Sequence, residues 1–170
     1  MFRRFVIRDV AILLVTIGLW LLSLETEPGT TLASVVSISA GVGALVCAYN
    51  FHEWGHLVVA RMTDSVFTPA RRVISPFLFS YDTEHNTPRQ FLLMSLGGFA
   101  ATAIFVVAFL LWMPRDQQAG RIALYGALIL ASLTVVIEFP IFFRALLGNT
   151  VPRTGMFKGP KVGGSRKNTP

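Results

Sequence analysis

Four long apolar runs dominate the sequence and leave few folds open to it. They cover residues 10–24, 31–61, 90–113 and 120–147. A helix needs about 20 apolar residues to cross a hydrocarbon core of roughly 30 Å, and each run approaches or exceeds that length. The chain is 53% hydrophobic and only 14% charged, unlike ordinary soluble domains. The expected fold class is therefore all-α, a polytopic membrane helical bundle with four transmembrane helices.

The basic residues lie at the ends of these runs. Thirteen of the 15 lysines and arginines precede the first run, separate the second from the third, or end and follow the fourth. By the positive-inside rule, both termini and the 62–89 connection are expected in the cytoplasm, and the protein in the cell (inner) membrane. The basic residues are not gathered on a soluble domain, so the pI near 10.3 predicts no nucleic-acid partner.

The two ends of the chain have different expected roles. The first run follows a basic start but ends without the small residues of a cleavage site, so residues 1–30 are predicted to be a retained anchor helix and a short external loop. Residues 31–147 form the expected membrane core. Residues 148–170 are rich in Gly, Pro, Lys and Arg, which predicts a disordered cytoplasmic tail attracted to anionic lipid headgroups.

The connection between the second and third runs is expected to be irregular. Pro69, Pro76 and Pro88 exclude a long helix there. The stretches VIS at 73–75 and FLFSY at 77–81 could form short strands. We therefore expect a small β-hairpin or a re-entrant segment in this cytoplasmic loop.

A polar motif, HEWGH, interrupts the second run. His52 and His56 are four residues apart, so a helix places both imidazoles on one face, where they can bind one metal ion. Glu53 would lie beside the open coordination position and act as general base. Zn²⁺ suits this ligand set. Chance would produce HExxH in this composition roughly once in a thousand sequences, and the alternatives are core histidines or a proton path.

The third metal ligand is expected on the fourth run. Glu138 is the sole acidic residue there. If Arg61 and Arg144 both mark the cytoplasmic interface, Glu138 lies about 9 Å deep, between His56 at roughly 8 Å and His52 at roughly 13 Å. Pro140 should kink this helix and free the carbonyl of the residue four positions earlier. The alternatives are a protonated, hydrogen-bonded Glu138 and three other ligands from the loop: Asp82, Glu84 and His85.

The third run opens with small residues that allow close helix packing. Gly97 and Ala101, and Gly98 and Thr102, form pairs of small side chains four residues apart. In a lipid environment such pairs permit direct contact between helix backbones. A neighbouring helix is therefore expected to approach this one closely.

HEWGH, followed by apolar residues and Arg61, resembles the site-2 protease family of intramembrane zinc metalloproteases (peptidase M50-like). The family motif looks like HExGH at the cytoplasmic end of a membrane helix, and Gly55 matches its glycine. GGFAAT at 97–102 is similar to a small-residue motif in the next helix of that family. The resemblance covers residues 31–147. The chain departs from the family where an aspartate in an NxxPxxxLDG-like stretch usually supplies the third ligand, because no such aspartate exists here.

This resemblance implies a three-helix core and a proteolytic function. The expected activity is hydrolysis, by metal-activated water, of a peptide bond in or near a transmembrane segment of a membrane protein substrate. Residues 73–81 could hold the unwound substrate as an added strand. The alternative is a non-proteolytic, metal-binding membrane scaffold or regulator of the same fold. A two-iron lipid-modifying enzyme would need more than the three histidines present.

Overall fold

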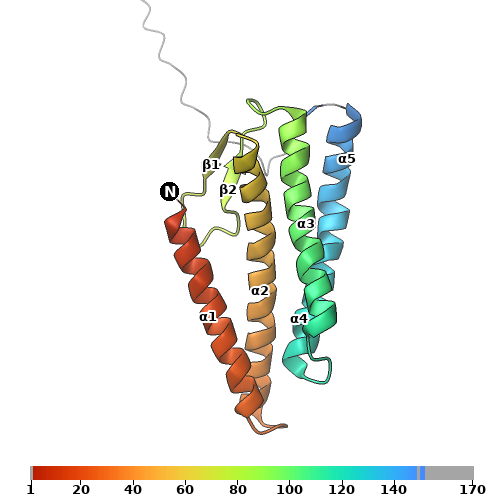
Figure 1. Cartoon of the computed structure of the whole chain (residues 1–170). Helices are drawn as coiled ribbons and strands as arrows, with labels where there is room; N and C mark the ends of the chain where they lie inside the picture. Colours follow the sequence, from red (N-terminus) through yellow and green to blue (C-terminus); the bar gives the residue numbers. More distant parts are fainter. Residues whose placement is uncertain (1, 149, 152–170) are drawn as a thin grey trace, which may run out of the picture.

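The fold is a bundle of four long helices with one small sheet at its end (Figure 1). The computed structural model describes residues 2–148 and 150–151, so most of the predicted basic tail at 148–170 lies outside the described residues. The helices that are long and apolar enough to cross a membrane are α1 (Arg3–Glu25), α2 (Thr31–Met62), α3 (Pro88–Trp112) and the continuous stretch Gln118–Gly148. The predicted four-helix fold is confirmed, whereas insertion into a membrane stays a prediction.

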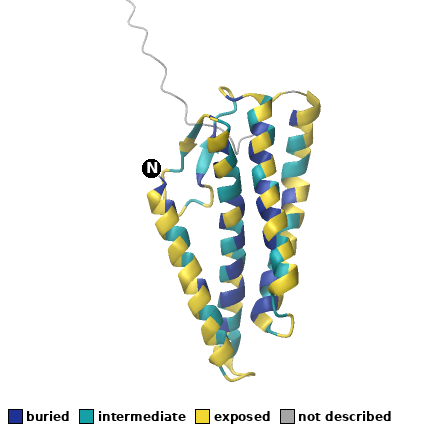
Figure 2. Cartoon of the chain, viewed as in Figure 1, coloured by how far each residue is buried: buried dark blue, intermediate teal, exposed yellow. Residues whose placement is uncertain are grey.

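The outer surface of this bundle is apolar. Figure 2 shows buried residues concentrated on α2 and α3, while α1 is mostly exposed. Large side chains such as Leu14, Ile104 and Ile129 are 62%, 59% and 61% exposed. In water such a surface would promote aggregation. Lipid tails, in contrast, are an apolar solvent for it, and the helices satisfy their backbone hydrogen bonds internally.

Helix α2 is the centre of the bundle and packs against α1, α3 and α4 (Gln118–Leu133). It approaches α3 closely at the pair Gly55 and Gly97. A Cβ atom on either glycine would lie 2.5 Å from the carbonyl oxygen of the other. Real Cβ atoms do not come this close, so only glycine permits the observed spacing. The predicted close packing of helices at this small-residue segment is confirmed.

The connection between α2 and α3 contains an antiparallel pair of strands, β1 (Phe67–Pro69) and β2 (Phe79–Tyr81). The predicted stretch 77–81 includes β2, but the prediction of a strand at 73–75 was wrong. That stretch is a turn, and the carbonyl oxygens of Val73 and Ser75 accept hydrogen bonds from Arg8 of α1. The strand that pairs with β2 is therefore β1.

The fourth long helix is irregular just before Pro140. Residues Thr134–Glu138 form a π-helical turn, η1, between α4 and α5 (Phe139–Gly148). The backbone N–H of Phe139 donates to the carbonyl oxygen of Thr134, five residues earlier. Proline has no N–H to continue an α-helical pattern, so the irregularity expected at Pro140 takes the form of a wider turn. Glu138 is the last residue of that turn.

Candidate metal centre

The structure brings the three predicted metal ligands together from two separate helices. His52 and His56 lie one turn apart on α2, and their Nε2 atoms are 3.0 Å apart. Glu138 reaches His52 Nε2 with Oε1 at 3.2 Å and His56 Nε2 with Oε2 at 3.5 Å. One potential ligand atom from each residue lies within 4.8 Å of the others. The three side chains therefore form a group that could hold one metal ion.

The spacing of these atoms fits tetrahedral coordination. Two atoms bound at about 2.0–2.1 Å with tetrahedral angles lie roughly 3.3 Å apart. The His52 Nε2–His56 Nε2 separation of 3.0 Å and the distance of 3.2 Å from His52 Nε2 to Glu138 Oε1 lie close to that value. Two imidazoles and one carboxylate are also a common ligand set for zinc. The donor set thus fits a small divalent ion, and its identity as Zn²⁺ stays a prediction.

Helix α3 orients both imidazole rings. His56 Nδ1 donates to the carbonyl oxygen of Met94 at 2.9 Å. His52 Nδ1 lies 3.2 Å from the carbonyl oxygen of Gly98 and 2.8 Å from Thr102 Oγ1. Because a carbonyl oxygen only accepts hydrogen bonds, these contacts assign the ring proton to Nδ1. The Nε2 lone pairs then face Glu138, as metal-binding histidines require.

Glu53, the predicted general base, lies beside this group. Its side chain is 7% exposed and lines the same cavity as His56 and Glu138. Glu53 Oε1 accepts a hydrogen bond from the Tyr49 hydroxyl at 3.4 Å. Glu53 Oε2 accepts one from the backbone N–H of Leu78, also at 3.4 Å. The carboxylate is thus held from α2 and from the loop that leads into β2.

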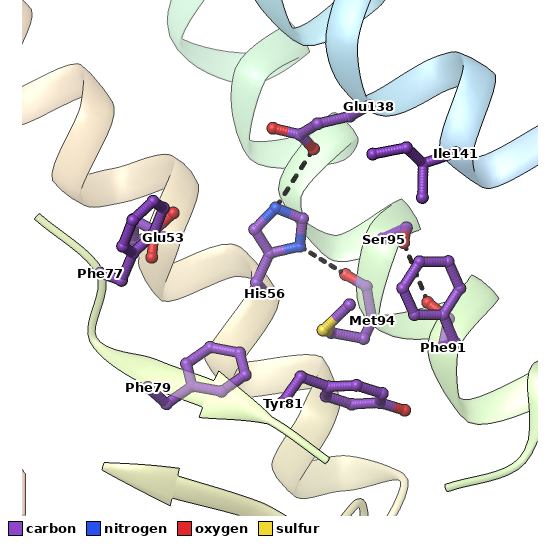
Figure 3. A pocket seen from close by; sticks show the side chains of 10 residues that line it. All are labelled: Glu53, His56, Phe77, Phe79, Tyr81, Phe91, Met94, Ser95, Glu138 and Ile141. Atoms are coloured by element: carbon purple, nitrogen blue, oxygen red, sulfur yellow. Dashed lines mark hydrogen bonds and ion pairs between the residues drawn. The ribbon is translucent and has the colours of Figure 1, made fainter. Parts of the chain in front are cut away.

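A cavity of about 80 Å³ opens next to the metal-binding group (Figure 3). Five of its lining residues carry polar groups: Glu53, His56, Tyr81, Ser95 and Glu138. The other lining residues are apolar and come from β2, the loop before it, α3 and α5: Phe77, Phe79, Phe91, Met94 and Ile141. The cavity therefore places ionisable side chains beside apolar and aromatic walls.

The alternative third ligands from the loop lie outside this group. Asp82 Oδ2 lies 2.8 Å from His85 Nδ1, and Asp82 Oδ1 accepts the backbone N–H groups of Glu84 and His85. Burial acts to raise the pKa of Asp82, but the hydrogen bonds from the His85 ring and the two N–H groups outweigh it and lower that pKa. Among the described residues, the group that could hold a metal contains Glu138 and none of these three.

Sequence reasoning missed an ion pair on α1 that supports the centre. Asp9 accepts hydrogen bonds from Arg8 Nε at 2.7 Å, Asn50 Nδ2 at 3.0 Å and Trp54 Nε1 at 2.7 Å. Arg8 also donates to two carbonyl oxygens of the turn at 73–75. This pair connects α1 to the HEWGH helix and to the loop that holds Glu53. An Arg-Asp dipeptide at the start of an apolar run was the available signal.

The protein is thus a bundle of long apolar helices that contains a His-His-Glu group, with a further glutamate beside that group. Comparison with family models, with curated proteins and with solved structures found no match to this chain. The chemistry of the residues in the centre therefore has to indicate the function.

Proposed function

We propose that this protein is an intramembrane zinc metalloprotease of the site-2 protease type. It hydrolyses a peptide bond in or near a transmembrane segment of a membrane protein substrate. The proposal rests on His52, His56 and Glu138, whose potential ligand atoms lie within 4.8 Å of one another. Glu53 lines the cavity that His56 and Glu138 also line. This constellation lies inside a bundle of apolar helices, where an unpaired charged group would be costly.

The proposed mechanism gives each polar side chain one task. His52, His56 and Glu138 hold Zn²⁺, which, when bound, supplies a Lewis acid and lowers the pKa of water to about 7. Glu53 accepts a proton from the attacking water and passes it to the nitrogen of the leaving peptide. The Tyr49 hydroxyl and the Leu78 N–H orient the Glu53 carboxylate for this transfer.

The substrate must present an extended backbone to this centre, because a helix buries its carbonyl groups in its own hydrogen bonds. We propose that β2 holds the unwound segment as an added strand. Phe79 and Tyr81 of this strand line the cavity, so a peptide paired there lies next to Glu53. Photocrosslinkers placed in 79–81 should capture the substrate, and their failure while crosslinkers elsewhere succeed would count against this placement.

A metal-binding scaffold without proteolytic activity is the second candidate. The chain lacks the aspartate stretch that usually supplies the third ligand in the site-2 protease family, and this departure favours the scaffold. In this case Glu53 would have no chemical task. Both candidate functions predict bound metal, but only the protease predicts cleavage of a substrate.

The decisive experiment compares metal content and cleavage in purified protein in detergent. Wild type and Glu53→Gln should contain stoichiometric zinc, whereas Glu138→Ala should lose it. Both variants should lose cleavage of a model membrane peptide by at least about 100-fold, since each removes a group used in the transition state. Glu84→Ala, at an exposed loop carboxylate, is the control and should retain both properties.

Each outcome of this experiment separates the candidates. Zinc without cleavage across a panel of membrane peptides supports the scaffold. Absence of metal from the wild type rejects both. Cleavage that survives Glu53→Gln rejects the role given to Glu53.

A further inference from the structure

The apolar and aromatic walls of the cavity lie beside the reactive groups. The residues that line the cavity include Glu53, His56 and Glu138. In the proposed function these three residues transfer protons or hold the metal. A peptide whose carbonyl group reaches them has its neighbouring side chains within reach of the same cavity. The size and polarity of the cavity therefore limit which side chain can lie next to the scissile bond.

The apolar and aromatic walls offer no charge and little hydrogen bonding to a substrate side chain. The Ser95 hydroxyl donates to the carbonyl oxygen of Phe91 within α3, at 3.0 Å. Burial, only partly offset by the contact with Ser65, raises the pKa of Tyr81 to about 12, so its phenol stays neutral. A charged or amide side chain placed here would lose its water without gaining a partner.

One wall of the cavity is rigid. Tyr81, Phe91 and Met94 are only 1–2% exposed and belong to one packed cluster with Ala60 and Ala145. The rings of Tyr81 and Phe91 pack edge to face, with their centroids 5.9 Å apart. Packed interiors resist a change in volume, so this wall cannot retreat to admit a larger group.

The volume of the cavity limits the side chain that it can accept. It measures about 80 Å³, while an engineered apolar cavity of about 150 Å³ holds a benzene molecule. A branched aliphatic side chain such as that of leucine suits the smaller space. An indole ring is too large for it, and a methyl group leaves much of it empty.

Ile141 bounds the cavity on the side of α5. It lies three residues after Glu138 and therefore on the same face of the helix. It is partly buried and packs against the rigid cluster. Unlike Glu53, His56 and Glu138, it has no polar group, so a change in its size alters the cavity without removing a reactive group.

We propose that this cavity is a selectivity pocket for a medium-sized aliphatic side chain at one of the two residues that flank the scissile bond, and that Ile141 sets its size limit. The inference rests on the proposed proteolytic function. The expected substrates are membrane segments that have leucine, or a residue of similar size, at that position.

The test uses model membrane peptides with Ala, Leu, Trp or Asp placed in turn on each side of the scissile bond. At one of these positions, wild type should cleave the Leu peptide with a kcat/KM about 10-fold above the Ala and Trp peptides. The Asp peptide should be the poorest substrate. Ile141→Ala should improve Trp relative to Leu by about 10-fold, and Ile141→Phe should impair Leu while sparing Ala.

Leu146→Ala is the matched control, because this residue is on the same helix, is 49% exposed and does not line the cavity. It should leave the order of substrates unchanged. Equal cleavage of the Ala, Leu and Trp peptides at both positions overturns the proposal. So does an order of preference that both Ile141 variants leave unaltered.

A binding measurement separates the failure of this inference from the failure of the proposed function. Fluorescence anisotropy of the same labelled peptides with Glu53→Gln protein needs no turnover. Tighter binding of the Leu peptide, reversed in favour of Trp by adding Ile141→Ala, supports the pocket even if wild type cleaves nothing. Equal affinities for all four peptides reject the pocket even if wild type is a protease.

Discussion

At the scale of single residues, the candidate metal centre depends on a glycine, Gly98, that leaves room for the His56 ring. Gly98 of α3 is buried, and a Cβ atom there would overlap the His56 ring, with Nδ1 only 2.7 Å away. We expect Gly98→Ala to displace this imidazole and to weaken metal binding about 10–100-fold, as perturbed outer contacts of metal ligands do. Titration of the apo protein with zinc measures the affinity, and circular dichroism checks that the helices persist.

Gly18→Ala is the control for this substitution. Gly18 lies within α1, and a Cβ atom there would meet no heavy atom within 4 Å. Alanine favours helix more than glycine does, so this variant should bind metal as wild type does. An unchanged zinc affinity in Gly98→Ala would show that the ring position of His56 is not needed for binding.

At the scale of elements, α1 holds the loop that supports Glu53. Arg8 donates hydrogen bonds of 2.8 Å to the carbonyl oxygens of Val73 and Ser75, a few residues before Leu78, whose N–H contacts Glu53. Hydrogen bonds to charged groups contribute about 1.5–3 kcal/mol, less for the exposed bond to Val73. Arg8→Met should therefore increase opening of this loop about 10-fold.

Limited digestion with trypsin measures this opening, because Arg71 and Arg72 are exposed in the same loop. Cleavage after them should be faster in Arg8→Met, and the hydrolytic rate should fall while bound zinc stays constant. Arg3→Met, at an exposed position of α1, should change neither property. Equal digestion rates in all three proteins would show that Arg8 does not hold the loop.

At the scale of the whole molecule, the distribution of charge predicts an orientation in the membrane. We expect the 26–30 connection outside the cell and the α2–α3 connection in the cytoplasm. In a Cys47→Ala background, an impermeant maleimide should label Glu27→Cys in intact cells. It should label Glu84→Cys only after permeabilisation, and both positions are exposed. The reverse pattern would place the metal centre near the outer surface.

The helices and part of the centre were predictable because their determinants are local. A run of apolar residues specifies a long helix, and a spacing of four residues places His52 and His56 on one face. Glu138 was predicted because it is the sole acidic residue of the fourth apolar run. The rise per residue, counted from Arg61 and Arg144, gave it a depth similar to that of the histidines, and the structure places it beside them.

The strand that pairs with β2 was not predictable in this way. Strand β1 has only three residues, Phe67–Pro69, and ends on a proline, so no alternating pattern marks it. The more apolar stretch at 73–75 was preferred, but Arg8, more than 60 residues earlier in the chain, binds its carbonyl groups. A contact between residues so far apart in the chain produces no periodic pattern in the sequence.

Local features of the sequence were thus enough to predict which segments are helical, which face of α2 carries the two histidines, and which carboxylate lies near them. The packing between elements could not be predicted: α3 orients both imidazoles, α1 holds the loop at Glu53, and side chains from several elements enclose one cavity. This difference arises because the helical repeat is a property of neighbouring residues. Contacts between elements depend on how whole surfaces pack.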